Sequence, residues 1–140
     1  MQVVAWDGQY ATGNPMLDEQ HQRLFVMINA LHAAIMTQCG REAVLTELER
    51  FARTTTDHFA SEDRLMMQQG YPQARRHRDC HVHLAAKANA MVYDFRAGKL
   101  KVSPSLSQFL GDWIRQHIEE EDRELIEWVK ARSAEKTRAA

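Results

Sequence analysis

The chain contains very few helix-breaking residues, and long uninterrupted segments lie between them. Only 6 glycines and 3 prolines occur in 140 residues. Within the segments, apolar residues recur at steps of three and four, the period of an amphipathic helix, and no stretch shows a convincing strand alternation. These features predict an all-α protein with four helices. Because the connections between the helices are short, we expect an antiparallel up-down-up-down four-helix bundle with an irregular N-terminal arm.

Capping residues set the expected boundaries. Asn14-Pro15 or Asp18 is a suitable start for the first helix, Gly40 ends it, and Ser103-Pro104 begins the fourth. Gly70-Tyr71-Pro72 separates the second helix from the third. The expected elements are an arm at residues 1–13, helices at about 14–39, 41–69, 72–97 and 103–131, and a frayed tail at 132–140. We interpret the whole chain, 1–140, as a single domain whose helix bundle covers about 14–131.

Composition and charge are typical of one globular domain, with 44% hydrophobic and 26% charged residues. Eighteen basic and nineteen acidic residues leave a formal net charge of −1, which favours neither nucleic acid nor an anionic membrane as a partner. The longest mostly apolar stretch, residues 25–36, is much shorter than the roughly 20 residues of a membrane span. Since no secretory signal is visible either, we expect a cytoplasmic protein.

Ionisable residues interrupt the apolar row on every predicted helix. The seven residues are His21 on the first helix, His58 and Glu62 on the second, His77 and His81 on the third, and His117 and Asp122 on the fourth. One inward histidine is more often a hydrogen-bonded core residue than a ligand. Seven such groups without partners would each cost several kcal/mol when charged, and a domain stable by about 5–15 kcal/mol cannot absorb that cost. We therefore expect them to bind metal.

The spacing of these residues suits a shared centre. Residues four apart, such as His58 and Glu62, lie on one face of a helix. His117 and Asp122 are five apart, which turns them about 140° on an α-helix. The fourth helix has two adjoining apolar rows, however, and these would keep both side chains at the buried surface.

The donor types narrow the choice of metal. Five histidines and two carboxylates without a thiolate disfavour a structural zinc site or an iron–sulfur cluster. Seven ligands are also too many for one ion. Two six-coordinate ions need about twelve bonds, and five imidazoles, two bridging carboxylates and one bridging oxygen supply about eleven. One position would stay open for a small molecule such as dioxygen.

In its motifs the chain resembles the hemerythrins, particularly the single-domain bacterial members. The matching residues are Trp6, Asp18-Glu19-Gln20-His21, His58-Phe59-Ala60-Ser61-Glu62, Tyr71-Pro72 with His77 and His81, and Trp113-Ile114-Arg115-Gln116-His117-Ile118 followed by Asp122. The resemblance implies a non-haem di-iron centre bridged by Glu62, Asp122 and an oxo or hydroxo group. It assigns the coordinatively full iron to His77, His81 and His117. The iron with the open position is assigned to His21 and His58.

The resemblance also implies reversible dioxygen binding, for transport, storage or delivery to an oxygen-using enzyme. By motif position, an apolar oxygen pocket would be lined by Leu24, Phe59, Trp113, Ile114 and Ile118. The alternative interpretation is that these five residues are ordinary core residues. The alternative function is an oxygen, redox or nitric oxide sensor or scavenger that acts through a signalling partner. The ligand rows show no general acid or positioned tyrosine, so we do not expect an enzyme.

Two further histidines fall outside the pattern. His83 lies on the opposite side of its helix from His77 and His81, and His32 flanks the apolar row of the first helix. We expect neither to bind metal.

Overall fold

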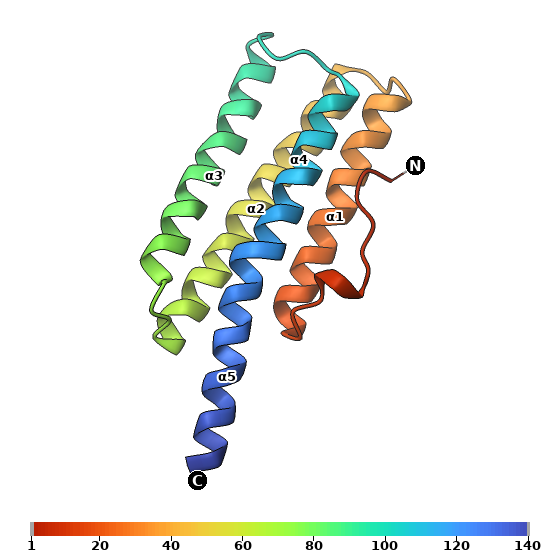
Figure 1. Ribbon diagram of the computed structural model, residues 1–140. Helices are drawn as coiled ribbons and strands as arrows, with labels where there is room; N and C mark the ends of the chain where they lie inside the picture. The colour runs from red at the N-terminus through yellow and green to blue at the C-terminus, as the bar shows by residue number, and fades with distance from the viewer. Residues whose placement is uncertain (1, 140) are drawn as a thin grey trace.

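Four helices lie side by side and make up most of the structure (Figure 1). The computed structural model describes residues 2–139, and within these residues there is no β-strand. The helices are α1 (Pro15–Met36), α2 (Arg41–Gln69), α3 (Ala74–Arg96) and a long fourth helix made of α4 (Pro104–His117), a π-helical turn (Ile118–Asp122) and α5 (Arg123–Ala139). Successive helices run in opposite directions, which confirms the predicted all-α up-down-up-down bundle.

The start of α1 and the end of α2 agree with the local sequence, whereas α1 ends at Met36 and not at about residue 39 as expected. The Asn14 side chain accepts a hydrogen bond from Leu17 N at 3.1 Å, and Pro15 occupies the first turn, where a missing N–H is tolerated. Helix α2 ends at Gly70, whose φ of 66° lies in the left-handed region. A side chain with a Cβ would be strained there. Both ends are therefore decided by residues within one helical turn.

Helix α3 begins later than expected. The sequence predicts a start at Pro72, but Tyr71, Pro72 and Gln73 form a turn closed by a hydrogen bond from Ala74 N to Tyr71 O at 3.1 Å. The Tyr71 ring is buried and packs edge-on against Trp128, with ring centroids 5.4 Å apart. The first helical residue is therefore Ala74, two residues after the expected start.

The C-terminal tail also differs from its prediction. Residues 132–140 are expected to fray, but helix α5 continues to Ala139 and extends past the ends of the other helices, while residue 140 lies outside the described residues (Figure 1). No glycine or proline follows Gly111, and alanine, glutamate, lysine and arginine are strong helix formers. The lost apolar period reflects exposure of most of this segment to solvent, not the end of the helix.

The apolar core has two parts. The larger cluster includes Leu24, Phe51, Ile114 and Ile118, and the smaller is centred on Leu17, Met66, Tyr71, Leu125 and Ile126. His21 on α1, His58 and Glu62 on α2, and Asp122 on the fourth helix fall between the two clusters along the chain. Within the smaller cluster the buried α2 residue is Met66, and its neighbour Leu65 is half-buried. A polar layer therefore divides the interior.

The N-terminal arm is tied to the bundle. The Asn29 side chain accepts hydrogen bonds from Val3 N and Val4 N at 2.9 and 3.2 Å and donates to Val4 O at 2.8 Å. Gly111 allows the close approach, because a Cβ there would lie 3.0 Å from a Val4 methyl carbon. Among the described residues, no helix combines the length and apolar character that a membrane span requires.

Candidate metal centre

Seven ionisable side chains from all four helices converge in the polar layer, and each is at most 3% exposed. Their ligand atoms form two groups, within each of which the atoms lie within 4.8 Å of one another. We call one group the two-imidazole half; it consists of His21, His58, Glu62 and Asp122. The other is the three-imidazole half; it consists of His77, His81, His117, Glu62 and Asp122. The structure thus brings together all seven residues that the sequence singles out.

The two carboxylates belong to both halves. In the two-imidazole half, His58 Nε2 lies 3.1 Å from Glu62 Oε2, and His21 Nε2 lies 2.9 Å from Asp122 Oδ2. In the three-imidazole half, His81 Nε2 lies 2.8 Å from the other Glu62 oxygen, Oε1. His77 and His117 place Nε2 at 3.2 and 3.1 Å from Asp122 Oδ1. Each carboxylate therefore offers one oxygen to each half.

These atoms approach one another without forming well-directed hydrogen bonds. Both oxygens of Glu62 and of Asp122, and His77 Nε2, are buried without a hydrogen-bond partner among the described residues. His21 Nε2 and His58 Nε2 face each other at 3.1 Å. Leaving so many buried lone pairs unsatisfied is costly, and nitrogen and carboxylate donors of this kind suit divalent transition metals. The residues present therefore fit a pair of metal ions.

Burial and mutual charge shift the pKa values in the cluster. Burial lowers the pKa of His58, but Glu62 and Asp122 more than offset it and raise the pKa to about 9. Burial also lowers the pKa of His77, but the hydrogen bonds and negative charges of Asp122 and Glu62 more than offset this effect and raise the pKa to about 9. For Glu62, burial favours a raised pKa, yet the facing imidazoles hold it well below its ordinary value. Without metal, the cluster would hold protons at neutral pH, so metal and protons compete for these sites.

A π-helical turn places the last two residues of the site. The sequence interpretation assumed a regular α-helix, in which His117 and Asp122 point about 140° apart. In the structure, Ile118–Asp122 form a π turn, whose hydrogen bonds span five residues. This extra residue per turn brings positions five apart onto the same side, and both side chains reach the cluster. The geometry differs from the expected one, although the two residues are the expected ones.

Outer contacts of the imidazoles were not foreseen from the sequence. His58 Nδ1 donates to Gln20 Oε1 at 2.7 Å, and His81 Nδ1 donates to Asp63 Oδ1 at 2.8 Å. Ligating histidines usually hydrogen-bond through their other nitrogen in this way. The sequence signal was weak: Gln20 directly precedes His21, and Asp63 directly follows Glu62, but neither lies on an apolar row.

Comparison with known proteins identifies the family. The sequence matches the hemerythrin HHE cation binding domain over residues 12–129, which is most of the chain. The chain belongs to the hemerythrin family. The bacteriohemerythrin of Stenotrophomonas maltophilia is 31% identical over 131 residues, covering 94% of this chain and 84% of the relative. That of Pseudomonas paraeruginosa is 32% identical over 132 residues, covering 93% and 84%.

Solved hemerythrin structures have the same fold. A crystal structure of wild-type hemerythrin superposes with a TM-score of 0.81 at 27% identity, covering 86% of this chain and 92% of the other. A leucine-to-tyrosine variant of hemerythrin gives a TM-score of 0.83 at 27% identity, covering 88% and 94%. The bundle is therefore a hemerythrin bundle over nearly its whole length.

The five residues predicted to line an oxygen pocket lie beside the polar layer of this hemerythrin domain. Leu24, Ile114 and Ile118 are fully buried in the larger apolar cluster. The Phe59 ring stacks on His81, with centroids 4.1 Å apart and planes 8° from parallel. Trp113 is half-buried and meets Phe59 edge-on at 6.5 Å. All five residues lie on helices that also carry the ionisable residues of the polar layer. Their role in oxygen binding stays a prediction.

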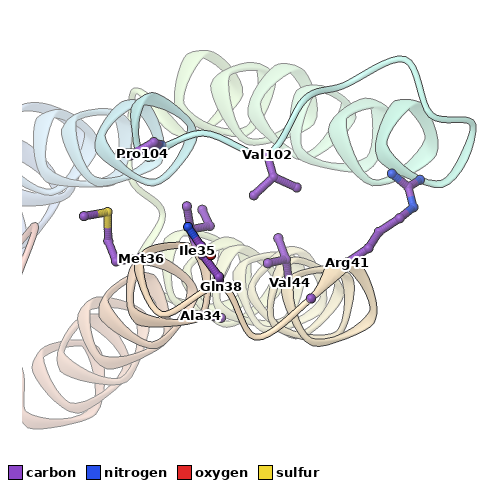
Figure 2. Close-up of a pocket in the computed structure, with 9 residues that line it drawn as sticks. Ala34, Ile35, Met36, Gln38, Arg41, Val44, Val102 and Pro104 are labelled. Atoms are coloured by element: carbon purple, nitrogen blue, oxygen red, sulfur yellow. The ribbon is translucent and has the colours of Figure 1, made fainter.

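One pocket of the bundle lies well away from the polar layer. A pocket of about 530 Å³ lies at the end of the bundle where α1 meets α2, and Figure 2 shows Val102 facing Val44 across it. Its α1 residue Ile35 is fourteen residues beyond His21, or about 20 Å along the helix. The lining has neither histidine nor carboxylate. This pocket is therefore separate from the seven ionisable residues.

The two remaining histidines have different surroundings. His32 is buried, and its Nδ1 lies 2.7 Å from Ser107 Oγ. That hydroxyl donates to Pro104 O, so it accepts its hydrogen bond from His32. His83 is exposed. Neither belongs to the two groups of possible metal ligands.

A matched pair of histidine variants tests the assignment on α3. We expect His81→Ala to hold fewer than two irons per chain and to unfold at lower temperature, because Glu62 and Asp63 lose a buried partner. The exposed His83→Ala should leave both quantities unchanged. Elemental analysis and thermal unfolding measure them. Equal behaviour of the two variants would show that the wrong face of α3 has been assigned.

Proposed function

We propose that this hemerythrin-family chain holds two irons and binds dioxygen reversibly. The observation that carries the proposal is that Glu62 and Asp122 each offer one oxygen to the two-imidazole half and one to the three-imidazole half. Two carboxylates shared in this way suit a bridged pair of ions rather than two independent sites. Membership of the hemerythrin family supports iron as the metal.

The unequal number of imidazoles supports one open position. In the proposal, His77, His81 and His117 would hold one iron, His21 and His58 would hold the other, and Glu62 and Asp122, with an oxo or hydroxo group, would be shared by both. Both bridging carboxylates serve each half, so the half with one imidazole fewer has one ligand fewer. When bound, the reduced iron pair supplies the two electrons and the vacant position that dioxygen binding needs.

The apolar residues around the site would keep water and acid away from it. Leu24 lies three residues after His21 on α1, and residues three apart share a helix face. Ile114 and Ile118 are both 0% exposed and belong to the larger apolar cluster. Exclusion of water from such a site preserves bound states that hydrolysis or protonation would discharge. Reversibility would therefore depend on packing rather than on a catalytic group.

The proposal is tested on the purified chain. The protein is loaded with ferrous iron without oxygen, its iron content is measured, and oxygen is then added and removed while the visible spectrum is followed. We expect two irons per chain and a spectral change that reverses when oxygen is removed. One metal ion per chain, or a change that cannot be reversed, would contradict the proposal.

A variant of Leu24 tests the role of the apolar lining. Leu24→Ser should admit water beside His21, and the oxygenated protein should then be lost several-fold faster while the iron content is unchanged. The decay of the visible spectrum measures this rate. Leu48→Ser is the control, because Leu48 is also buried but lies ten residues, about 15 Å, before His58 on α2. Equal decay rates in both variants would remove Leu24 from the pocket.

A sensor or scavenger of oxygen, redox state or nitric oxide is the second candidate. The projecting, largely exposed end of α5 supports it, because that segment is available to a signalling partner (Figure 1). The same decay measurement separates the two functions. A carrier, which transports or stores oxygen or delivers it to an oxygen-using enzyme, retains its oxygenated form for long periods. A sensor or scavenger discharges it quickly.

A further inference from the structure

The outer contacts of the ligand histidines differ between the two halves of the site. In the two-imidazole half, His58 meets the neutral amide of Gln20, and His21 Nδ1 is buried without a hydrogen-bond partner among the described residues. In the three-imidazole half, His81 meets the carboxylate of Asp63. His117 Nδ1 has the Glu121 carboxylate at 3.6 Å. The outer contact is therefore a neutral amide in one half, whereas carboxylates lie beside the imidazoles of the other.

A chain of hydrogen bonds fixes the orientation of the Gln20 amide. Ser61 Oγ donates its proton to Asp57 O at 3.3 Å and accepts from Arg64 at 3.2 Å. Since its only proton is used, Ser61 must also accept from Gln20 Nε2, which lies 3.3 Å away. The amide carbonyl of Gln20 consequently points at His58.

This orientation also decides the tautomer of His58. Gln20 Oε1 only accepts, so the proton of a neutral His58 lies on Nδ1, 2.7 Å away. The lone pair is then on Nε2, the atom that faces Glu62 and His21. Gln20 thus presents His58 to the cluster in the only tautomer that binds a metal through Nε2.

The charge of the outer partner has a second effect. A carboxylate that accepts from a ligating imidazole makes that ligand more basic, and a more basic ligand favours the higher oxidation state of the metal. A neutral amide increases the basicity of the imidazole less and therefore favours the higher oxidation state less. Asp63 accepts from His81 in the three-imidazole half, where the Glu121 carboxylate also lies 3.6 Å from His117 Nδ1, beyond hydrogen-bond distance. The two-imidazole half has only Gln20.

We propose that Gln20 is a positioning residue that holds His58 in its metal-binding tautomer and, being uncharged, keeps the reduction potential of the two-imidazole half higher than a carboxylate would. This inference rests on the proposed function, because it needs iron at that half. It identifies a determinant of the oxidation state at the half to which the open position is assigned.

Three variants at two neighbouring positions test the inference. Gln20→Glu keeps an acceptor for His58 but adds a charge, and Gln20→Ala removes the acceptor. Gln22→Glu is the control, because it adds the same charge to the same helix at an exposed position. Each protein is loaded with ferrous iron without oxygen, its iron content and affinity are measured, and the potential is determined by mediated redox titration followed spectroscopically.

The expected results differ for each variant. Gln20→Glu should hold two irons with a potential shifted downward from the unaltered protein, and Gln22→Glu should match the unaltered protein. Gln20→Ala should bind its more weakly held iron about 10- to 100-fold less tightly, the usual cost of losing an outer partner. The opposite change, Asp63→Asn, should shift the potential upward by weakening the acidic support of His81.

The outcomes separate this inference from the proposed function. If the unaltered protein fails to take up two irons, the proposed function is wrong, and this inference falls with it. If the unaltered protein holds two irons but Gln20→Glu and Gln22→Glu have the same potential, only the role of Gln20 is wrong. Loss of iron in Gln20→Glu, whose carboxylate can still accept from His58, also overturns it.

Discussion

Replacing Glu62 by glutamine is expected to leave the chain without its iron pair. Glu62 lies at the centre of the cluster, with Oε2 at 3.1 Å from His58 Nε2 and Oε1 at 2.8 Å from His81 Nε2. A glutamine of the same shape has one oxygen and one NH₂ group, and the latter is a donor that cannot bind a cation. One half would lose a ligand and the other would keep only a neutral one. Iron content should fall from two per chain to fewer than one.

The matched control for this variant is Glu127→Gln on α5. Glu127 is exposed and lies outside both groups of possible ligands, so its variant should still hold two irons. Elemental analysis of both proteins after the same anaerobic loading gives the comparison, and circular dichroism checks that each is folded. If Glu62→Gln retained two irons, the carboxylate would not be a shared ligand.

Removing the iron is expected to make the stability of the fold depend strongly on pH. The metal-free cluster holds His58 and His77 with pKa values raised to about 9, whereas an unfolded chain has them at 6.5. Between these values the folded chain binds more protons than the unfolded one, so the free energy of unfolding falls as pH rises. The stabilisation is fully present below about pH 6.5 and is lost through about pH 9. For a single imidazole this amounts to about 3 kcal/mol.

Urea unfolding of the iron-free protein at about pH 7 and about pH 9.5 measures this change. We expect a clear fall of the unfolding midpoint in the iron-free protein. The iron-loaded protein is the control and should change little over the same range, because metal replaces the protons on the imidazoles. A midpoint that stays constant without iron would show that the imidazoles do not hold protons in the folded chain.

Local sequence determined most of the helices. Helix α2 spans Arg41–Gln69, the range that its flanking glycines predict, and Asn14 and Pro15 set the start of α1. Capping hydrogen bonds and backbone preferences act within one turn, so neighbouring residues are enough to predict them. The seven ionisable residues could be singled out for a similar reason. Helical periodicity shows which face of each helix is buried, and polar residues on that face stand out.

Only the tertiary structure decided features that depend on another helix. The Tyr71 ring packs against Trp128, fifty-seven residues later in the chain. The carbonyl of Gln20 points at His58 because α1 and α2 lie side by side. Likewise, Asp63 on α2 meets His81 on α3. These partners lie off the apolar rows, and no local rule pairs residues on different helices.

The π turn shows most directly what the sequence alone could not predict. Regular α-helix geometry points His117 and Asp122 about 140° apart, and no helix breaker between them signals a change. The sequence by itself determined that both belong on the buried surface of the fourth helix. That Ile118–Asp122 adopt the wider turn was decided by the cluster, in which Asp122 lies 2.9 Å from His21 and His117 lies 3.1 Å from Asp122. A less common backbone geometry is stable here because it completes contacts to residues on other helices, and such contacts exist only in the folded bundle.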